Sequence, residues 1–432
     1  MPNGSSIRTV QTTGRYLVLL PEGEASSGMA ALTDSTGVRD IDDSAVSNIG
    51  VAVVALDPNQ LQSLIAAVAG PQPILAAEPE QIMYALESIV ISGDTANYLQ
   101  GYKDGVNNLV NSLTNDQVAL KEQLTTSAFS NGATTWGLQA TKVVRSRYSG
   151  AGIKVAVLDT GLDLTHPDFA GRTITSRSFI KDEDVQDLQG HGTHCIGTSC
   201  GPLNPPEPSS PMRYGIAYNA EIFAGKVLSN QGSGADGGIL AGIDWAITNG
   251  CQIISMSLGA PTRPGDTYSP IYEEVAKRAL SRGTLIIAAA GNESARNGRR
   301  LVPPSPVGRP ANCPSIMAVA ALDKQLQIAY FSNSSINPDG GEIDIAGPGV
   351  DVYSTWSTDP MTVLPPNGLG PSRYVAINGT SMATPHVAGI AALYAEATGK
   401  RGYELWALLM QNAQRLNLPS SDVGIGLVQA PI

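Results

Sequence analysis

Four polar residues, far apart in the sequence, stand where an apolar run ends or where a helix is expected to begin. Asp159 closes the run IKVAVLD, His191 lies in GHGTHCIGT, Asn292 follows LIIAAAG, and Ser381 stands in NGTSMATPHVAGIAAL. A carboxylate, an imidazole, an amide and a hydroxyl on a helix N-terminus are groups that acyl transfer through a covalent intermediate requires. The pattern therefore predicts nucleophilic catalysis, with Ser381 as the candidate nucleophile.

Each of these residues also has a purely structural explanation. A hydroxyl before a helix satisfies an unpaired backbone N–H group, so Ser381 or Thr380 would serve as a helix cap. Asp159 and Asn292 would stabilise turns after their strands, and His191 would be satisfied by local hydrogen bonds. Taken singly, each residue favours the structural explanation. The four together, all at edges of one expected sheet, favour catalysis.

The elements expected to position these residues alternate between strand and helix. Beyond Thr134 the short apolar runs are KVAVLDT, EIFAGKVL, QIISMSLG, TLIIAAAGN and SIMAVAALD, and stretches such as ADGGILAGIDWAITNG and YEEVAKRALSRG between them have helical character. Continuous apolar strands that alternate with helices are typical of a parallel sheet covered on both faces. We therefore predict an α/β domain over residues 132–432, with polar residues gathered where the strands reach their carboxyl edge.

Two further segments precede this domain. Residues 12–86 contain RYLVLL, GVAVVALDPNQLQSLIAAVAG and PILAAEPEQIMYAL, which predict a strand, a strand followed by a helix, and another strand, in a small α+β domain. Residues 87–131 are more polar and carry apolar residues at helical spacing in DGVNNLVNSLTNDQVALKEQL. This spacing predicts helical pieces in a connector.

Composition excludes several classes of protein. The chain has 432 residues, of which 42% are hydrophobic and 15% charged, as expected for a globular protein with one large domain and one small one. No apolar run approaches the ~18 residues that would span a bilayer. A net charge of −11 disfavours a nucleic-acid or anionic-membrane partner. The four cysteines show no metal-ligand spacing and are expected to be reduced, buried thiols.

The four motifs resemble the signature blocks of the subtilisin-like serine proteases, in that family's chain order of Asp, His and Ser. The resemblance runs from about Trp136 to Gln429. It implies a serine endopeptidase in which Ser381 attacks the peptide carbonyl, His191 transfers the proton and Asp159 orients the imidazole. Asn292 would donate to the oxyanion, and the chemistry would require no cofactor.

The resemblance also implies roles for the remaining histidines and for a cysteine. His194, His386 and His166 would be structural. Cys195 follows His194 in the helix that is expected to carry His191, so its thiol would lie close to the catalytic imidazole.

The first small domain is similar in pattern to the family's inhibitory propeptide. The resemblance implies a zymogen that processes itself, with the domain's last strand lying in the substrate cleft. The maturation cut would fall near Tyr84–Ser88, which we favour, or near Ser127–Ala133. The alternative is a regulatory domain that stays attached. We expect a monomer whose partner is a peptide or protein substrate.

The substrate cleft is assigned by the same resemblance. An extended peptide would lie as an added strand between two short segments, and a wall of small residues would form a roomy apolar pocket for a large apolar or aromatic side chain. The stretch ESARNGRRLVPPSPVGRPANCP departs from the family's pocket loop, and its Arg296, Arg299 or Arg300 would instead attract acidic side chains. The expected cleft residues are Gly232, Ser233, Gly234, Ser257, Leu258, Gly259, Ala288, Ala289, Ala290 and Gly291.

A calcium site is a weaker inference from the family. Asp168 stands where the family commonly provides a calcium ligand, but the companion loop CGPLNPPEPSSPMRYGIAY is rich in proline and poor in side-chain oxygens. Calcium requires 6–8 oxygen ligands. The alternative to a structural calcium ion is a loop that proline stiffens without one.

Two other functions and the compartment are left open by the sequence. A peptide ligase or macrocyclase would use the same acyl-enzyme, and a binding protein on the same fold would need an inert triad. The start MPNGSSIRTVQTTGRYLVLL lacks a basic segment followed by an apolar one, so no signal peptide is predicted. We expect a cytoplasmic location for the chain as written, and secretion where a signal has been removed.

Overall fold

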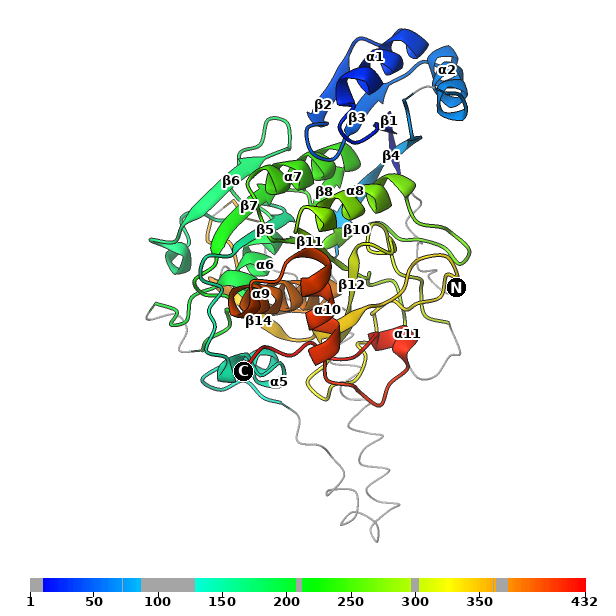
Figure 1. Ribbon diagram of the computed structural model, residues 1–432. Helices are drawn as coiled ribbons and strands as arrows, with labels where there is room; N and C mark the ends of the chain where they lie inside the picture. The colour runs from blue at the N-terminus through cyan, green and yellow to red at the C-terminus, as the bar shows by residue number, and fades with distance from the viewer. Residues whose placement is uncertain are drawn as a thin grey trace, which may run out of the picture.

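The large domain is built on a seven-stranded parallel sheet with the order β13-β12-β11-β9-β5-β7-β6 (Figure 1). The computed structural model describes residues 11–71, 73–86, 129–206, 212–296, 303–359, 361–362 and 372–432. All neighbouring strands of this sheet run parallel, so the predicted parallel sheet is confirmed. The strands are β5 (Lys154–Asp159), β6 (Ile174–Ser178), β7 (Glu221–Lys226), β9 (Ile253–Met256), β11 (Leu285–Ala289), β12 (Met317–Leu322) and β13 (Ile345–Pro348).

Strands such as β9, β11 and β12 are buried at every position, because helices cover both faces of this sheet. Helices α6 (His191–Cys200) and α9 (Thr380–Thr398) lie together on one side, and α7 (Asp236–Thr248) and α8 (Pro270–Ser281) lie on the other (Figure 1). None of the described helices is long and apolar enough to cross a lipid bilayer. Further elements of this domain are α5 (Trp136–Ala140), η1 (Val143–Arg145), η2 (Pro167–Phe169), β8 (Ser233–Ala235), β10 (Leu258–Gly259), β14 (Val352–Thr355), β15 (Tyr374–Ile377), α10 (Gly402–Asn412) and α11 (Ser420–Val423).

The small domain is an antiparallel sheet with two helices. Its elements are β1 (Thr12–Leu19), α1 (Ala25–Thr36), β2 (Ile41–Ala45), β3 (Val51–Ala55), α2 (Pro58–Ala69) and β4 (Ala76–Ala85). Sequence reasoning missed α1 and β2. The sequence of α1, ASSGMAALTDST, is rich in small polar residues, and β2, IDDSA, is an edge strand with two exposed carboxylates, so neither carries a strong apolar period. The helical pieces predicted within residues 87–131 lie almost entirely outside the described residues.

The sheet of the small domain has two apolar faces, because successive strand residues point to opposite sides. Val18 and Val54 pack in the domain's own core with residues of α1 and α2. Leu17, Leu19 and Val53 belong instead to the core of the large domain. Figure 1 shows the small domain resting on α7 and α8, which contact its strands. The two domains therefore share one apolar interface.

Polar side chains of α7 and α8 form hydrogen bonds with the turn between β2 and β3 of the small domain. The carboxylate of Asp244 in α7 accepts hydrogen bonds from Ser47 Oγ at 2.6 Å, from Asn48 N at 2.6 Å and from Ile49 N at 3.1 Å. Arg278 in α8 donates to the carbonyl oxygen of Ile49 at 2.7 Å. These bonds satisfy backbone groups of the turn between β2 and β3 that the interface buries.

The docking prediction concerns Asp244. We expect Asp244→Ala to weaken docking of the small domain by about 2–4 kcal/mol, because several hydrogen bonds to a charged, buried acceptor are lost together. The measurement is amide hydrogen exchange of β1 and β3, which should become faster. Asp34→Ala, which removes an exposed carboxylate from α1, is the control and should leave the exchange unchanged. Equal exchange in both variants would contradict the assigned contact.

Candidate active site

Asp159 and His191 form a buried ion-pair geometry at the carboxyl edge of the large sheet. Asp159 is the last residue of β5 and His191 is the first of α6. His191 Nδ1 lies 2.7 Å from Asp159 Oδ1, and both side chains are inaccessible to solvent. Gly190, which precedes the helix, has φ +100°, and a Cβ there would lie 2.3 Å from Trp356. A glycine is therefore required for α6 to begin at this place.

Neighbouring groups raise the pKa of His191 although its ring is buried. Burial by itself lowers the pKa of the imidazole, but the charge and hydrogen bond of Asp159 outweigh burial, with a smaller contribution from Cys195, and hold the pKa well above its usual value. The Cys195 thiol lies 3.9 Å from His191 Nδ1, as expected from the sequence, and burial raises the pKa of this thiol to about 11. All four cysteines are free and buried, as predicted.

Ser381 is the second residue of α9 and does not cap it. The N-cap residue is Gly379, which has no side chain that could cap the helix. Ser381 Oγ lies instead within hydrogen-bond distance of two carbonyl oxygens, that of Leu86 at 2.7 Å and that of Ser257 at 3.0 Å, as acceptors for its single O–H. Within the described part of the chain, His191 Nε2 has no hydrogen-bond partner. The serine hydroxyl therefore faces a peptide carbonyl.

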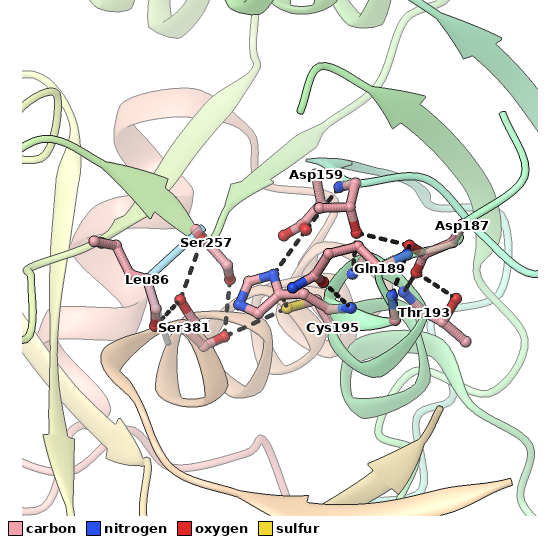
Figure 2. A network of polar contacts seen from close by, with 12 residues as sticks. Leu86, Asp159, Asp187, Gln189, Thr193, Cys195, Ser257 and Ser381 are labelled. Atoms are coloured by element: carbon pink, nitrogen blue, oxygen red, sulfur yellow. Dashed lines mark hydrogen bonds and ion pairs between the residues drawn. The ribbon is translucent and has the colours of Figure 1, made fainter. Parts of the chain in front are cut away.

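The same carbonyl oxygen of Leu86 accepts a second hydrogen bond, from Asn292 Nδ2 at 2.7 Å. Asn292 Oδ1 accepts from Thr380 N at 2.9 Å and from Thr380 Oγ1 at 2.8 Å, which fixes the direction of the amide. Figure 2 shows Leu86, Ser257 and Ser381 together on one side of the network, with Asp159 on the other. The carbonyl oxygen of Leu86 thus lies within hydrogen-bond distance of both the serine hydroxyl and an amide donor, and an amide donor at a carbonyl oxygen is what an oxyanion hole requires.

Strand β4 carries Leu86 into this position by pairing with two short strands. β8 (Ser233–Ala235) and β10 (Leu258–Gly259) both pair antiparallel with β4. Ala85 N donates to the carbonyl oxygen of Gly232 at 2.9 Å, and Leu86 N donates to that of Ser257 at 3.3 Å. The two segments predicted to hold an extended peptide do hold one here, and it is a segment of the same chain.

The small residues predicted to form a pocket wall follow strand β11. Ala288 and Ala289 end the strand, Ala290 and Gly291 come next, and all four are buried.

The basic residues proposed to alter this pocket are placed differently. Arg296 pairs with Asp422 at 2.8 Å and donates to the carbonyl oxygen of Ser332, so its charge is neutralised by a residue outside the pocket wall. Arg299 and Arg300 lie outside the described residues.

The three other histidines bond to backbone carbonyl groups. His194 Nε2 lies 3.0 Å from Val352 O, and His386 Nδ1 lies 2.8 Å from Met382 O. His166 Nε2 lies 3.1 Å from the carbonyl oxygen of Arg373. Burial lowers the pKa of His194 to about 3 and that of His386 to about 4, so both are neutral. These contacts suit structural roles.

The surroundings of Asp168 do not fit a calcium ion. Tyr374 donates its hydroxyl to Asp168 Oδ1 at 2.7 Å, and Tyr214 donates to Oδ2. Asp168 N donates to His166 Nδ1 at 3.3 Å. Phenol hydroxyls and an imidazole do not supply the 6–8 oxygens that calcium prefers. The carboxylate is satisfied by protein donors.

Comparison with known proteins agrees with this geometry. Residues 150–426, more than half of the chain, match the model of the Subtilase family. The chain belongs to the subtilase family. Subtilisin E of Bacillus subtilis (strain 168) is 41% identical over 248 residues, which are 57% of this chain and 56% of that protein. Subtilisin of Bacillus pumilus is also 41% identical, over 57% of this chain and 78% of that protein.

A third relative has a similar identity and coverage. Alkaline protease of Alkalihalobacillus alcalophilus is 40% identical over 262 residues, which are 60% of this chain and 58% of that protein. The matched region of this subtilase thus spans little more than half the length of several relatives.

Sequence reasoning missed several residues of this subtilase that complete the site. Leu86 lay within the favoured range of the cut but was not singled out. Thr380 entered only as a helix cap, and Thr160 and Asp187 were not considered, although both lie in the hydrogen-bond network around Asp159. The only available signal was that both threonines adjoin candidate catalytic residues.

The prediction for Asp168 is a chelation experiment. We expect a calcium chelator to change the midpoint of thermal unfolding equally in the wild type and in Asp168→Asn, since tyrosine hydroxyls occupy this carboxylate. The variant itself should be less stable by about 1–3 kcal/mol, because a buried acceptor is lost. A chelator that destabilises the wild type and leaves Asp168→Asn unaffected would place a calcium ion at this residue.

Proposed function

We propose that this chain is a serine endopeptidase that hydrolyses peptide bonds through an acyl-enzyme. The observation that carries the proposal is the position of the Leu86 carbonyl oxygen, 2.7 Å from both Ser381 Oγ and Asn292 Nδ2. A peptide bond in this place is presented to a nucleophile and to an oxyanion donor together. The substrate is a peptide or protein, and the chemistry uses only groups of the chain itself.

Each residue has a defined part in this mechanism. Ser381 attacks the carbonyl carbon, while His191 Nε2 takes the hydroxyl proton and later delivers it to the leaving amine. Asp159 holds the proton of His191 Nδ1 and stabilises the imidazolium that forms. Asn292 Nδ2 and the backbone N–H of Ser381 stabilise the negative charge on the carbonyl oxygen. Water then attacks the acyl-enzyme and releases the acid.

The proposal includes a precursor that cuts itself after Leu86. Strand β4 pairs with β1 in the small domain and continues between β8 and β10, so the domain's end occupies the cleft. A product left in this position blocks other substrates, which gives the small domain an inhibitory role. The docking contacts of Asp244 and Arg278 support it, since they keep the segment at high local concentration.

The processing prediction compares the wild type with Ser381→Ala. On incubation, the wild type should shorten and gain activity, with a new N-terminus at Glu87, and the released fragment should end at Leu86. Ser381→Ala should stay full length and inactive, because only the nucleophilic oxygen is lost. N-terminal sequencing and intact mass give the readout.

The control for this experiment is Ser26→Ala, which removes an exposed hydroxyl from α1 and should still be processed. A hydrolysed peptide gains one water, whereas a ligated or cyclised product does not, so the same mass measurement distinguishes a ligase. A wild type that is fully active with its N-terminus intact would rule out the inhibitory precursor.

The oxyanion prediction concerns Asn292. We expect Asn292→Ala to lower kcat by about 10²–10³, the magnitude found for loss of such a donor in subtilisin, with a much smaller change in KM. The reason is that the amide donates most strongly when the oxyanion has formed. The substrate is a p-nitroanilide of Met-Tyr-Ala-Leu, which reproduces residues 83–86. A change confined to KM would assign Asn292 to ground-state binding.

A further inference from the structure

A second buried carboxylate, Asp187, lies beside the Asp159–His191 pair and takes no part in the mechanism above. It is inaccessible to solvent and accepts five hydrogen bonds. Three come from backbone N–H groups, those of Gln189 at 3.1 Å, Gly190 at 2.8 Å and Thr193 at 2.8 Å. A carboxylate that is buried and so fully satisfied has one fixed orientation.

Two hydroxyl groups complete the contacts of Asp187. Thr193 Oγ1 donates to its Oδ2 at 2.7 Å, and Thr160 Oγ1 donates to its Oδ1 at 2.9 Å. Figure 2 shows Asp187, Gln189 and Thr193 close to Asp159. The bond to Thr160 is the one that leads toward the candidate catalytic residues, since Thr160 directly follows Asp159.

The contacts of Asp187 and Thr160 determine where helix α6 begins. The first N–H groups of a helix have no partner within it. Here three side chains accept them: Gln189 Oε1 accepts from His191 N at 2.7 Å, and Thr160 Oγ1 accepts from Gly192 N at 2.8 Å. Asp187 Oδ2 accepts from Thr193 N, which also places negative charge at the positive end of the helix dipole. The helix that carries His191 is thus fixed against Thr160 and Asp187.

Thr160 also determines the orientation of Asp159. Its backbone N–H donates to Asp159 Oδ1 at 2.7 Å, the same oxygen that pairs with His191. Within the described residues, Asp159 Oδ2 has no hydrogen-bond partner. The carboxylate is therefore oriented by two donors, one from His191 and one from Thr160.

We propose that Asp187 and Thr160 are positioning residues, and that the Thr160 hydroxyl helps them hold Asp159 and His191 in a fixed orientation relative to each other. The Thr160 hydroxyl accepts from the helix of His191 and donates to Asp187, while the Thr160 N–H holds Asp159. The inference rests on the proposed function, because it assigns a purpose to an arrangement in which His191 transfers protons. Asp187 is not a catalytic residue, since it contacts neither the reacting atoms nor the cleft segment in this structure.

The positioning role can be measured through the pKa of His191, which depends on the titratable groups around its ring. The titratable groups recorded around its ring, among the described residues, are Asp159 from β5 and Cys195 from α6, with His194 next along the same helix. Asp159 raises the pKa of His191, so the enzyme loses activity as the pH falls through that pKa. Looser alignment of Asp159 weakens this effect, and the acid limb of the pH profile then moves to lower pH.

The test uses Thr160→Val and Thr160→Ser, each produced as the full chain and assayed, like the wild type, after processing is complete. Valine keeps the shape of threonine and removes the hydroxyl, whereas serine keeps the hydroxyl. With the Met-Tyr-Ala-Leu p-nitroanilide, Thr160→Val should lower kcat about 10- to 100-fold, change KM little and move the acid limb to lower pH. Thr160→Ser should restore both the rate and the acid limb. The proton of His191 Nδ1, followed by NMR, should broaden or shift only in the valine variant.

A second pair of variants tests Asp187 itself. Asp187→Asn keeps the volume but leaves Thr193 or Thr160 without an acceptor, and should have the same kinetic effects as Thr160→Val. The matched control is Asp163→Asn, since Asp163 is also buried and accepts hydrogen bonds from Thr165 and Thr358. The control should lose stability while the acid limb stays in place. The Asp187→Asn and Thr160→Val effects should not add in the double variant.

Two outcomes would overturn the inference. One is a folded Thr160→Val with the wild-type acid limb and rate. The other is an acid limb that moves equally in Asp163→Asn, which would reduce Asp187 to a structural carboxylate. Neither outcome affects the proposed function, which instead fails if Ser381→Ala retains its turnover.

Discussion

The arrangement of the two domains depends on a single extended strand. β4 pairs with β1 over its first half, as a member of the small domain's sheet, and its end pairs with β8 and β10 of the large domain. Strand pairing fixes the register of every residue in β4. The orientation of the small domain and the position of Leu86 in the cleft are therefore geometrically linked. Backbone hydrogen bonds hold the end of β4 between β8 and β10, so this pairing imposes little sequence preference.

Charged groups hold the middle of this strand where it leaves the small domain. Arg309 contacts Glu78 of β4 at 2.6 Å and Asp236 of α7 at 3.2 Å. Asp236 Oδ2 also accepts from Gln81 N at 2.8 Å. Burial raises the pKa of Asp236 to about 6, although Arg309 opposes this effect. The strand therefore crosses between the domains over a buried cluster in which one guanidinium pairs with two carboxyl groups, which costs less than an isolated buried charge would.

The sequence predicts those parts of the molecule that depend on local pattern. Strands such as β5 and β11 are largely apolar runs, and Asp159 ends the first while Asn292 follows the second, so both the parallel sheet and the candidate residues follow from the sequence and the family resemblance. The network of Asp187 does not, because an aspartate in DVQDLQGH looks like any loop carboxylate until the fold brings Thr160 to it. Asp168 illustrates the same limit: the hydroxyls that satisfy it come from 46 and 206 residues away, and no local signal distinguishes them from calcium.

Two threonines next to the candidate catalytic residues use the same physical device on opposite sides of the site. Thr160 follows Asp159 and donates its N–H to it, and Thr380 precedes Ser381 and donates its N–H to Asn292. Both hydroxyls accept from a backbone N–H, of Gly192 and of Gly291, and donate to a side-chain oxygen. A hydroxyl can accept and donate at once, and a β-branched side chain has few rotamers. Each threonine thus ties a candidate catalytic side chain to a neighbouring segment of backbone, which aligns both halves of the site.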